Sequence, residues 1–151
     1  PGHFLVSMPV EGGLLVLDPY HRGRSIDVQE LKSRAQPHVG EQDIHDEQLS
    51  QLLTPASNRA ILTRMLRNLK ALYVEQEDWA RAVRCADRLL MLDPEQPEEL
   101  RDRGLLYLRV GHLAACRADL NRYLARVPPP DDAAKIREVL VQSGRDRARL
   151  N

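Results

Sequence analysis

The sequence predicts an α+β protein: an N-terminal antiparallel β-hairpin followed by a longer, mostly α-helical part made of paired helices. Two observations support this prediction. Apolar, β-forming residues flank the pair Gly12-Gly13 near the start of the chain, a pattern typical of a hairpin. From about residue 55 onward the sequence repeats with a period of 34 residues, and each unit ends in proline. At 151 residues, 42% of them hydrophobic, the chain is long enough to bury a core.

The hairpin is predicted from the segments FLVSM and LLVL, which are separated by PVEGG. Its register depends on the position of the turn. A turn centred between Val10 and Glu11 places His3 directly opposite Asp18, with Cβ atoms about 4.5–5.5 Å apart. A turn centred on the following glycine pair instead places Arg22 opposite His3. The sequence leaves both registers open.

His3 and Asp18 are the first candidate functional residues. A carboxylate beside an imidazole fixes the tautomer of the ring and favours its protonated form, which is the relation between a general base and its orienting partner. Spacing alone favours the simpler interpretation that the two side chains form a surface ion pair.

Two short helices are predicted between the hairpin and the repeats, after a polar loop with the sequence DPYHRGRS. Asp27 and Glu30 have the spacing of a capping box, which predicts a helix from there to about Ala35. The stretch QPHVGEQD is predicted as a loop and DEQLSQLL as the second helix. Together with the hairpin, these segments form the first expected domain, residues 1–54.

The helical half is predicted to contain two tetratricopeptide repeats in residues 55–130, with Ser57 or Asn58 as the first N-cap. Equivalent residues lie 34 positions apart, as in the pairs Leu66 and Leu100, Tyr73 and Tyr107, and Pro94 and Pro128. Paired helices closed by proline at this period are the tetratricopeptide signature. Residues 131–151 are expected to form a capping helix and tail that cover the open end of the stack.

Two positions depart from the repeat pattern. Lys70 occupies a place that usually holds a small residue, as Gly104 does in the second repeat. Glu77 replaces the turn glycine that Gly111 supplies later. The matched tyrosines and prolines outweigh both departures, and the prediction of two repeats stands.

The first helix of each repeat lines the concave side of such a stack, where these proteins bind extended peptides. Four polar side chains on that side are candidate peptide-binding residues: Arg64, Arg67, Asn68 and Arg101. The guanidinium groups of the three arginines predict an acidic peptide or another carboxylate as the partner, in an arrangement that partly resembles the carboxylate clamp of other repeats. The alternative is that the groove packs against the chain's own linker near DEQLSQLLTP, which makes the arginines structural.

The hairpin and the helical half together resemble a known bacterial family. PGHFLV followed by LVLDPYHRGR is similar to the His-strand and the Asp-strand of the transglutaminase-like fold. With NRAILTRMLRNLKALY and the repeats behind them, these motifs resemble the transglutaminase-like/tetratricopeptide proteins that include the SirB-type regulators of enteric bacteria, over essentially the whole chain. The resemblance implies that the hairpin is the remnant of a transglutaminase-like sheet, with His3 as the catalytic-type histidine and Asp18 as its orienting aspartate.

The nucleophile of that family is a cysteine upstream of these strands, and the resemblance places its position outside this chain. Cys85 and Cys116 fall on the second helices of the two repeats, where small packing residues are expected. A His–Asp pair without a nucleophile performs no acyl transfer, so we expect this chain to be catalytically silent. The chain is also expected to be the C-terminal portion of a longer protein.

These features lead to one preferred function and two alternatives. The preferred function is that of a protein-interaction or regulatory module of a transglutaminase-like tetratricopeptide protein, whose His–Asp pair is inactive here. The first alternative is a fragment of a cysteine-dependent acyl transferase or amide hydrolase, whose cysteine lies upstream and whose repeats recruit a substrate. The second alternative is a free-standing peptide-binding scaffold in which the hairpin only caps the repeats.

Composition argues against several other functions. The formal net charge is zero, whereas general nucleic-acid binding requires an excess of cationic side chains. No run approaches the roughly 20 apolar residues that span a bilayer, and the histidines share no metal-ligand spacing with cysteines or paired acids. We therefore expect a protein or peptide partner, no nucleic-acid or membrane partner, no metal and no cofactor. Two cysteines within helical patterns fit the reducing cytoplasm.

Overall fold

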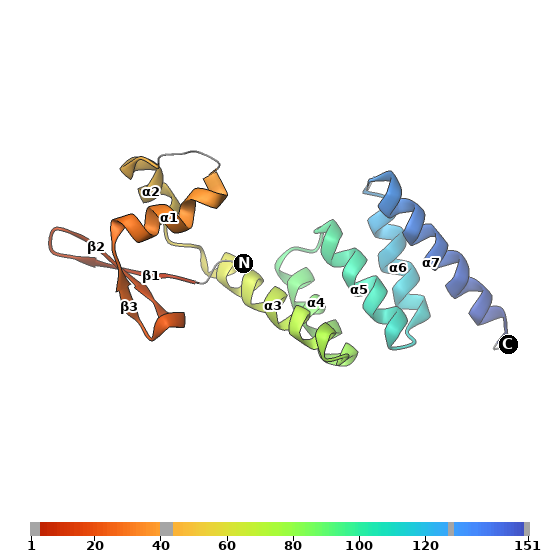
Figure 1. Cartoon of the computed structure of the whole chain (residues 1–151). Helices are drawn as coiled ribbons and strands as arrows, with labels where there is room; N and C mark the ends of the chain where they lie inside the picture. Colours follow the sequence, from red (N-terminus) through yellow and green to blue (C-terminus); the bar gives the residue numbers. More distant parts are fainter. Residues whose placement is uncertain (1–3, 40–43, 127–128, 150–151) are drawn as a thin grey trace. The chain divides into compact units, whose positions relative to one another are not determined.

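A computed structural model describes residues 4–39, 44–126 and 129–149 of the chain. The chain divides into two compact units, residues 1–56 and residues 57–151, which run from red to yellow and from yellow-green to blue in Figure 1. The first unit combines a small sheet with two helices, and the described part of the second contains five helices. The α+β fold class expected from the sequence is confirmed.

The first unit is built on a three-stranded antiparallel sheet with the strand order β1-β2-β3. Strands β1 (Val6–Val10) and β2 (Gly13–Asp18) form the expected hairpin. A short 3-10 helix, η1 (Pro19–His21), then leads to β3 (Arg24–Ile26), which pairs with the other edge of β2. The sequence analysis missed β3, because a strand of three residues is too short to show an alternating pattern.

The register of the hairpin differs from both registers considered from the sequence. Its turn consists of Glu11 and Gly12, and Gly12 adopts a φ of 83°, which glycine reaches without steric cost. The observed pairing lies midway between the two expected ones. The register that set His3 opposite Asp18 and the register that set Arg22 there are therefore both wrong. His3 itself lies outside the described residues.

The first helix of this unit, α1 (Val28–Val39), begins where the capping-box spacing predicted. The side chain of Asp27 accepts a hydrogen bond from the backbone N–H of Glu30 at 2.8 Å. The helix was expected to end near Ala35 but continues through Pro37. A proline in the last turn removes only one hydrogen bond of the helix, so the helix tolerates it there.

The second helix, α2 (Asp46–Leu52), was also expected from the sequence. The core of the unit consists of five buried side chains from the sheet, the helices and the segment between them: Val16, Ile26, Leu31, Ile44 and Leu49. The other face of the hairpin carries Val6, Met8 and Val10, which are each about half exposed.

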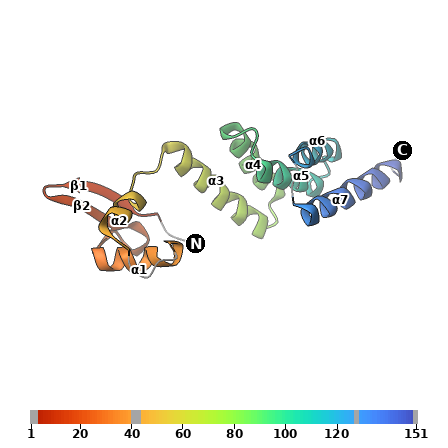
Figure 2. The same cartoon turned by 90° about the horizontal axis from the view of Figure 1, so that it is seen from above.

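The second unit is a stack of antiparallel helix pairs, as the 34-residue period predicted. Its helices are α3 (Asn58–Glu75), α4 (Trp79–Leu92), α5 (Pro97–Arg109), α6 (Leu113–Leu124) and α7 (Pro130–Arg149). Helix α3 packs against α4, α4 against α5, α5 against α6 and α6 against α7, so that the five helices follow one another in a single stack (Figures 1 and 2). Ser57 is the N-cap of α3, where its side chain accepts the N–H of Ala60 at 3.2 Å.

Two glycines of the second repeat explain its geometry. Gly111 has a φ of 76° in the turn between α5 and α6. Gly104 lies where α5 and α6 approach closely, because a Cβ atom added there would lie 2.7 Å from Cδ2 of Leu120. The first repeat holds Glu77 and Lys70 at the equivalent positions, and Glu77 adopts a φ of 55° in spite of its side chain.

Candidate functional site

The first candidate site lies at the end of β2, where Asp18 is fully buried. Asp18 is the N-cap of η1, and its Oδ1 accepts hydrogen bonds from the backbone N–H groups of Tyr20 at 3.0 Å and His21 at 3.3 Å. Pro19 follows as the first residue of the turn, a position where its missing N–H costs nothing. The local sequence therefore fixes this carboxylate at the end of the strand.

The second carboxylate oxygen of Asp18 binds two side chains. Arg34 of α1 donates from Nη1 at 2.8 Å, and Nδ1 of His21 lies 2.7 Å away. Because an ionised carboxylate only accepts hydrogen bonds, Nδ1 of His21 carries the proton in this contact. Arg34 also donates to Glu30, which in turn is paired with Arg24. The site thus continues into a chain of alternating charges.

This environment keeps Asp18 ionised. Burial alone raises the pKa of a carboxyl group, but the hydrogen bonds from Arg34 and His21 outweigh burial and hold the pKa of Asp18 well below its usual value of 3.8. The hydrogen bond from Arg24 lowers the pKa of Glu30 as well. The site is therefore a fixed negative charge that holds a guanidinium group and an imidazole.

The structure joins Asp18 to a histidine that the sequence analysis did not single out. The predicted partner, His3, lies outside the described residues, so the His3–Asp18 pair stays a prediction. The position of His21 three residues after a capping aspartate was the signal that could have revealed its contact. An aspartate that holds Nδ1–H of an imidazole leaves Nε2 as the basic nitrogen of the ring. Asp18 thus has the chemistry of an orienting carboxylate.

The two cysteines are packing residues, as the repeat pattern predicted. Cys85 on α4 and Cys116 on α6 are both buried and free. Burial raises the pKa of each thiol, and a protonated, inaccessible thiol is a poor nucleophile.

The second candidate site is the side of the second unit that α3 and α5 line. Arg67 of α3 donates from Nε to Glu99 of α5 at 2.8 Å. Lys70 donates from Nζ to Glu99 and to Asp102, each at 2.6 Å. Glu99 is only 3% exposed and Lys70 only 9%. The lysine that departs from the repeat pattern therefore joins the two helices by a buried ion pair with Glu99 and a partly buried one with Asp102.

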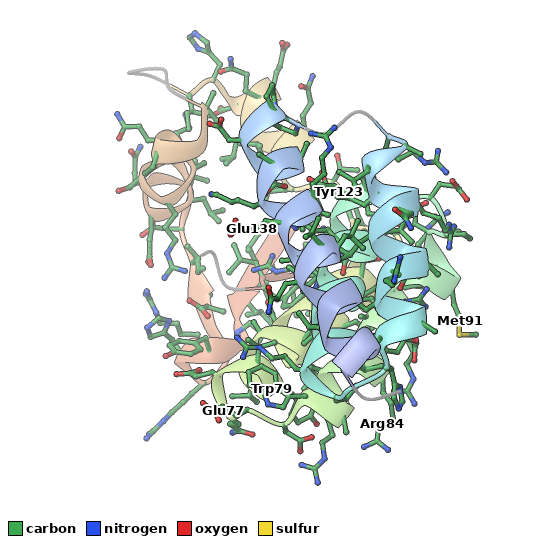
Figure 3. The ribbon with its side chains drawn as sticks, turned by 90° about the vertical axis from the view of Figure 1, so that its right-hand side faces the viewer. Glu77, Trp79, Arg84, Met91, Tyr123 and Glu138 are labelled. Carbon is green, nitrogen blue, oxygen red and sulfur yellow. The ribbon has the colours of Figure 1, made fainter. Side chains whose placement is uncertain are left out.

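Arg101 extends this network toward α7. It donates to Asp102 and to Asp132, each at 3.0 Å, and its guanidinium carbon lies 5.9 Å from the ring centroid of Tyr123. Tyr123 also donates to Asp132, and Figure 3 shows Tyr123 beside α7. Arg67 and Arg101, two of the four predicted peptide-binding residues, are thus paired with carboxylates of the chain itself.

A hollow of about 540 Å³ lies along the N-terminal half of α3, and we call it the cationic hollow. Its lining includes Arg59, Arg64, Arg67 and Asn68. Three of the four predicted residues therefore share one cavity, whereas Arg101 is not among the lining residues. An open cavity with several guanidinium groups suits an anionic, extended segment.

Across the three described ranges, no three His, Cys, Asp or Glu side chains are grouped so that they could hold a metal ion. In the same part of the chain, no helix has the length and apolar character to cross a membrane.

Family models match both parts of the chain. Residues 1–67 match the transglutaminase-like superfamily, and residues 69–141 match the tetratricopeptide repeat. The C-terminal TPR-containing domain of an FK506-binding protein of Plasmodium falciparum has a similar structure, with a TM-score of 0.55 and 17% identity over 80% of this chain and 77% of that chain. At this identity the likeness concerns the fold alone. These matches define a protein that joins a transglutaminase-like segment to tetratricopeptide repeats.

Curated relatives narrow this class. A UPF0162 protein of Xylella fastidiosa is 49% identical over 147 residues, which are 97% of this chain and 52% of the relative. Protein SirB1 of Salmonella typhimurium is 26% identical over 129 residues, 85% of this chain and 46% of the relative. The chain thus spans about half the length of the curated relatives it matches. The resemblance to the SirB-type family that the motifs indicated is confirmed.

Proposed function

We propose that this chain is a protein-interaction module whose second unit binds an extended acidic peptide of a partner protein. The observation that carries the proposal is the cationic hollow, which brings Arg59, Arg64 and Arg67 together beside Asn68. Guanidinium groups bind carboxylates by charge-assisted hydrogen bonds, and an asparagine amide both donates to and accepts from a peptide backbone. Tetratricopeptide stacks present such surfaces to extended segments.

The ion pairs within the chain determine which guanidinium nitrogens can bind the peptide. Among the described residues, Arg67 binds Glu99 through Nε alone, and its side chain is 47% exposed, so its terminal nitrogens can donate to a ligand. Arg101 uses Nε and both terminal nitrogens for carboxylates of the chain. A peptide reaches Arg101 only by competing with those carboxylates. In this proposal Arg101 is therefore secondary to the residues that line the cationic hollow.

The proposal treats His3 and Asp18 as a catalytic-type pair that performs no chemistry in this module. The matched transglutaminase-like segment and the buried, ionised Asp18 support a site derived from an enzyme. Because Cys85 and Cys116 are buried packing residues, neither thiol supplies the nucleophile that acyl transfer needs. The role of the module is then regulatory, through its partner.

The binding test uses the whole chain and a short fluorescein-labelled peptide that alternates Asp and Glu. Fluorescence anisotropy is expected to show binding of this peptide and not of the matching Asn/Gln peptide. Arg64→Glu is expected to weaken binding by about tenfold or more, because it turns an attractive charge into a repulsive one. Arg67→Gln is expected to weaken binding less, since the amide still reaches Glu99.

The matched control is Arg84→Glu. Arg84 is exposed on α4, outside the cationic hollow, and Figure 3 shows its side chain extending away from the helices. Arg84→Glu changes the net charge of the chain by the same amount as Arg64→Glu. If Arg84→Glu leaves peptide affinity unchanged, the loss in Arg64→Glu is due to its place in the cationic hollow. Equal losses in Arg64→Glu and Arg84→Glu, or full affinity in both, would refute the proposal.

A second candidate function has the geometry of Asp18 in its favour. In a full-length protein, this carboxylate could orient the histidine of a cysteine-dependent acyl transferase or amide hydrolase, with the repeats recruiting the substrate. Alkylation of the full-length protein by iodoacetamide at mildly acidic pH tests this function. Fast alkylation of one cysteine that Asp18→Asn slows supports the enzyme, and uniformly slow alkylation rejects it.

A further inference from the structure

A second cavity, with apolar walls, lies between α3, α4 and α5. We call it the Trp79 pocket: it encloses about 330 Å³, and its walls are Val74 of α3, Trp79 of α4, and Leu105 and Leu106 of α5. Leu106 is buried in the core of the unit, whereas Val74 is 39% exposed. The pocket therefore rests on the core and opens to solvent, and its volume is that of a small ligand site.

Helix α3 aligns the Trp79 pocket with the cationic hollow. Thr63 and Arg67 line the hollow, and Lys70 and Val74 line the pocket. These four residues are spaced by three or four positions, so they follow one face of the helix. From Thr63 to Val74 the helix rises by about 16 Å, a distance that about five residues of an extended peptide span. One extended peptide can therefore reach both cavities.

The rim of the Trp79 pocket keeps one positive charge. Lys70 and Asp102 at the rim bind each other at 2.6 Å, and their charges offset one another. Arg109 is exposed, and its guanidinium carbon lies 5.3 Å from the ring centroid of Trp79. Among the residues that the structure describes, no carboxylate forms an ion pair with Arg109. The stacked guanidinium beside an apolar cavity thus complements a carboxylate next to an apolar group.

We propose that the Trp79 pocket binds one aliphatic or aromatic side chain of the acidic peptide, and that Arg109 binds a carboxylate next to this side chain. The inference rests on the proposed function and specifies its partner. The partner presents an extended acidic segment with an apolar anchor residue about five positions from the carboxylates held in the cationic hollow. The carboxylate at Arg109 belongs to an acidic side chain or to the C-terminus of the partner, since both offer the same chemistry.

Trp79 makes this proposal measurable, because it is the only tryptophan of the chain. The whole chain is titrated with two unlabelled peptides without tryptophan: one of Asp and Glu with a single leucine, the other with glycine in place of the leucine. Burial of one leucine is expected to strengthen binding by about tenfold or more. The leucine peptide is also expected to shift Trp79 emission to shorter wavelength as it displaces water, and the glycine peptide is not.

Variants at the pocket test where the leucine binds. Val74→Phe fills the cavity from a partly exposed position, so it is expected to remove the advantage of the leucine peptide while the glycine peptide binds as before. The matched control is Val141→Phe, which adds the same ring to a residue of α7 that is 56% exposed. Circular dichroism melting establishes that each variant is folded.

Arg109→Gln tests the carboxylate contact. It is expected to weaken binding of the leucine peptide severalfold, whereas Arg84→Gln, on the exposed surface of α4, leaves binding unchanged. Amidation of the peptide C-terminus separates the two sources of the carboxylate. If amidation weakens binding to the unmodified chain but not to Arg109→Gln, Arg109 binds the C-terminal carboxylate of the peptide. If amidation has no effect, Arg109 binds an acidic side chain. Full affinity in Arg109→Gln would overturn the assigned contact.

The outcomes separate this inference from the proposed function. If both peptides bind equally, without a change in Trp79 emission, and Arg64→Glu still weakens their binding, the pocket is refuted and binding of an acidic peptide in the cationic hollow is supported. If neither peptide binds, both ideas are overturned. If an uncharged leucine peptide binds as tightly as the acidic one and shifts Trp79 emission, and Val74→Phe abolishes the shift, the pocket is supported and binding of acidic residues in the cationic hollow is refuted.

Discussion

At the scale of single residues, Asp18 connects three parts of the first unit: β2, η1 and α1. It ends β2, caps η1 and holds the imidazole of His21 in that helix, and it binds Arg34 of α1. A buried carboxylate with this many donors is stabilised in its charged form, because each donor would lose its partner if the carboxyl group were protonated. The same arrangement that fixes the fold at this point therefore also creates the charge of the site.

The first prediction concerns the charge of Asp18. Asp18→Asn is expected to lower the melting temperature by several degrees near neutral pH, because the partly buried guanidinium of Arg34 then faces a neutral amide. The pKa of Asp18 in the folded chain lies below its ordinary value of 3.8. Its stabilising effect is therefore complete above that value and is lost as the pH falls from there toward the folded-state pKa.

The measurement is thermal unfolding of both chains, followed by circular dichroism over a series of pH values. The difference between the two melting temperatures is expected to be largest near neutral pH and to shrink below about pH 4. A difference that stays constant or grows in acid would show that the charge of Asp18 does not stabilise the fold.

The second prediction concerns Glu77, whose φ of 55° places a non-glycine residue in the left-handed region. That conformation costs about 1–2 kcal/mol for an L-residue, and replacing Glu77 with glycine removes this cost. Part of the gain in stability is lost, because glycine has greater conformational freedom in the unfolded chain. Glu77→Gly is expected to raise the free energy of unfolding by about 0.5–1 kcal/mol in urea titrations. Gly111→Ala, at a φ of 76° in the equivalent turn, should lower it. Destabilisation by Glu77→Gly would contradict this account.

At the scale of elements, the two repeats use different means to bring helices together. Gly104 lets α5 and α6 approach closely over Leu120. At the equivalent place in α3, Lys70 instead reaches across to Glu99 and Asp102 of α5. Ion pairs therefore join α3 and α5. Along α3, the cationic hollow lies toward the N-terminus of these ion pairs and the Trp79 pocket toward the C-terminus.

The third prediction tests the ion pairs between α3 and α5. Lys70→Ala is expected to lower the free energy of unfolding by about 3 kcal/mol, because buried Glu99 loses one of its two cationic partners. Lys32→Ala is the control: Lys32 pairs with exposed Asp46, so its loss should cost at most about 1 kcal/mol. Urea unfolding of the two variants measures both. Equal costs would show that the buried pairs contribute no more than a surface pair.

The fourth prediction tests the close approach of α5 and α6. Gly104→Ala is expected to cost about 1–3 kcal/mol, because its Cβ would meet Leu120 at 2.7 Å and force the helices apart. The matched control is Gly144→Ala on α7, where the added Cβ meets only Arg117 at an ordinary 3.7 Å. That variant should be stabilised by about 0.5–1 kcal/mol through helix propensity. Thermal unfolding distinguishes the two, and a neutral Gly104→Ala would contradict the packing.

At the scale of the whole molecule, local signals in the sequence predicted the helices and most of the strands. They did not predict which residues far apart in the sequence pair with one another. Asp27 and Ser57 were recognisable as caps because a cap acts within three residues. The hairpin register depends on the turn geometry and on pairing with the rest of the sheet, so the sequence left it open. The partners Lys70 and Glu99 lie 29 positions apart, and neither residue signals the other.

The candidate sites likewise differ in whether local sequence or the packing of distant segments forms them. Helical spacing was enough to place Arg64, Arg67 and Asn68 on one side of α3, and the structure shows all three lining one cavity. The Trp79 pocket was not predicted, because its walls come from three helices and only their packing brings them together. The contact of His21 with Asp18 is local and could have been found from the turn sequence.

The central claim is that the second unit binds an acidic peptide along α3 and α5. The most direct measurement is to record backbone amide NMR spectra of the isotope-labelled chain during titration with the acidic peptide that carries one leucine. We expect the largest shift changes at the residues of α3 and α5 that line the cationic hollow and the Trp79 pocket, and at the indole N–H of Trp79. Changes confined to the first unit or to α7, or no changes at all, would contradict the claim.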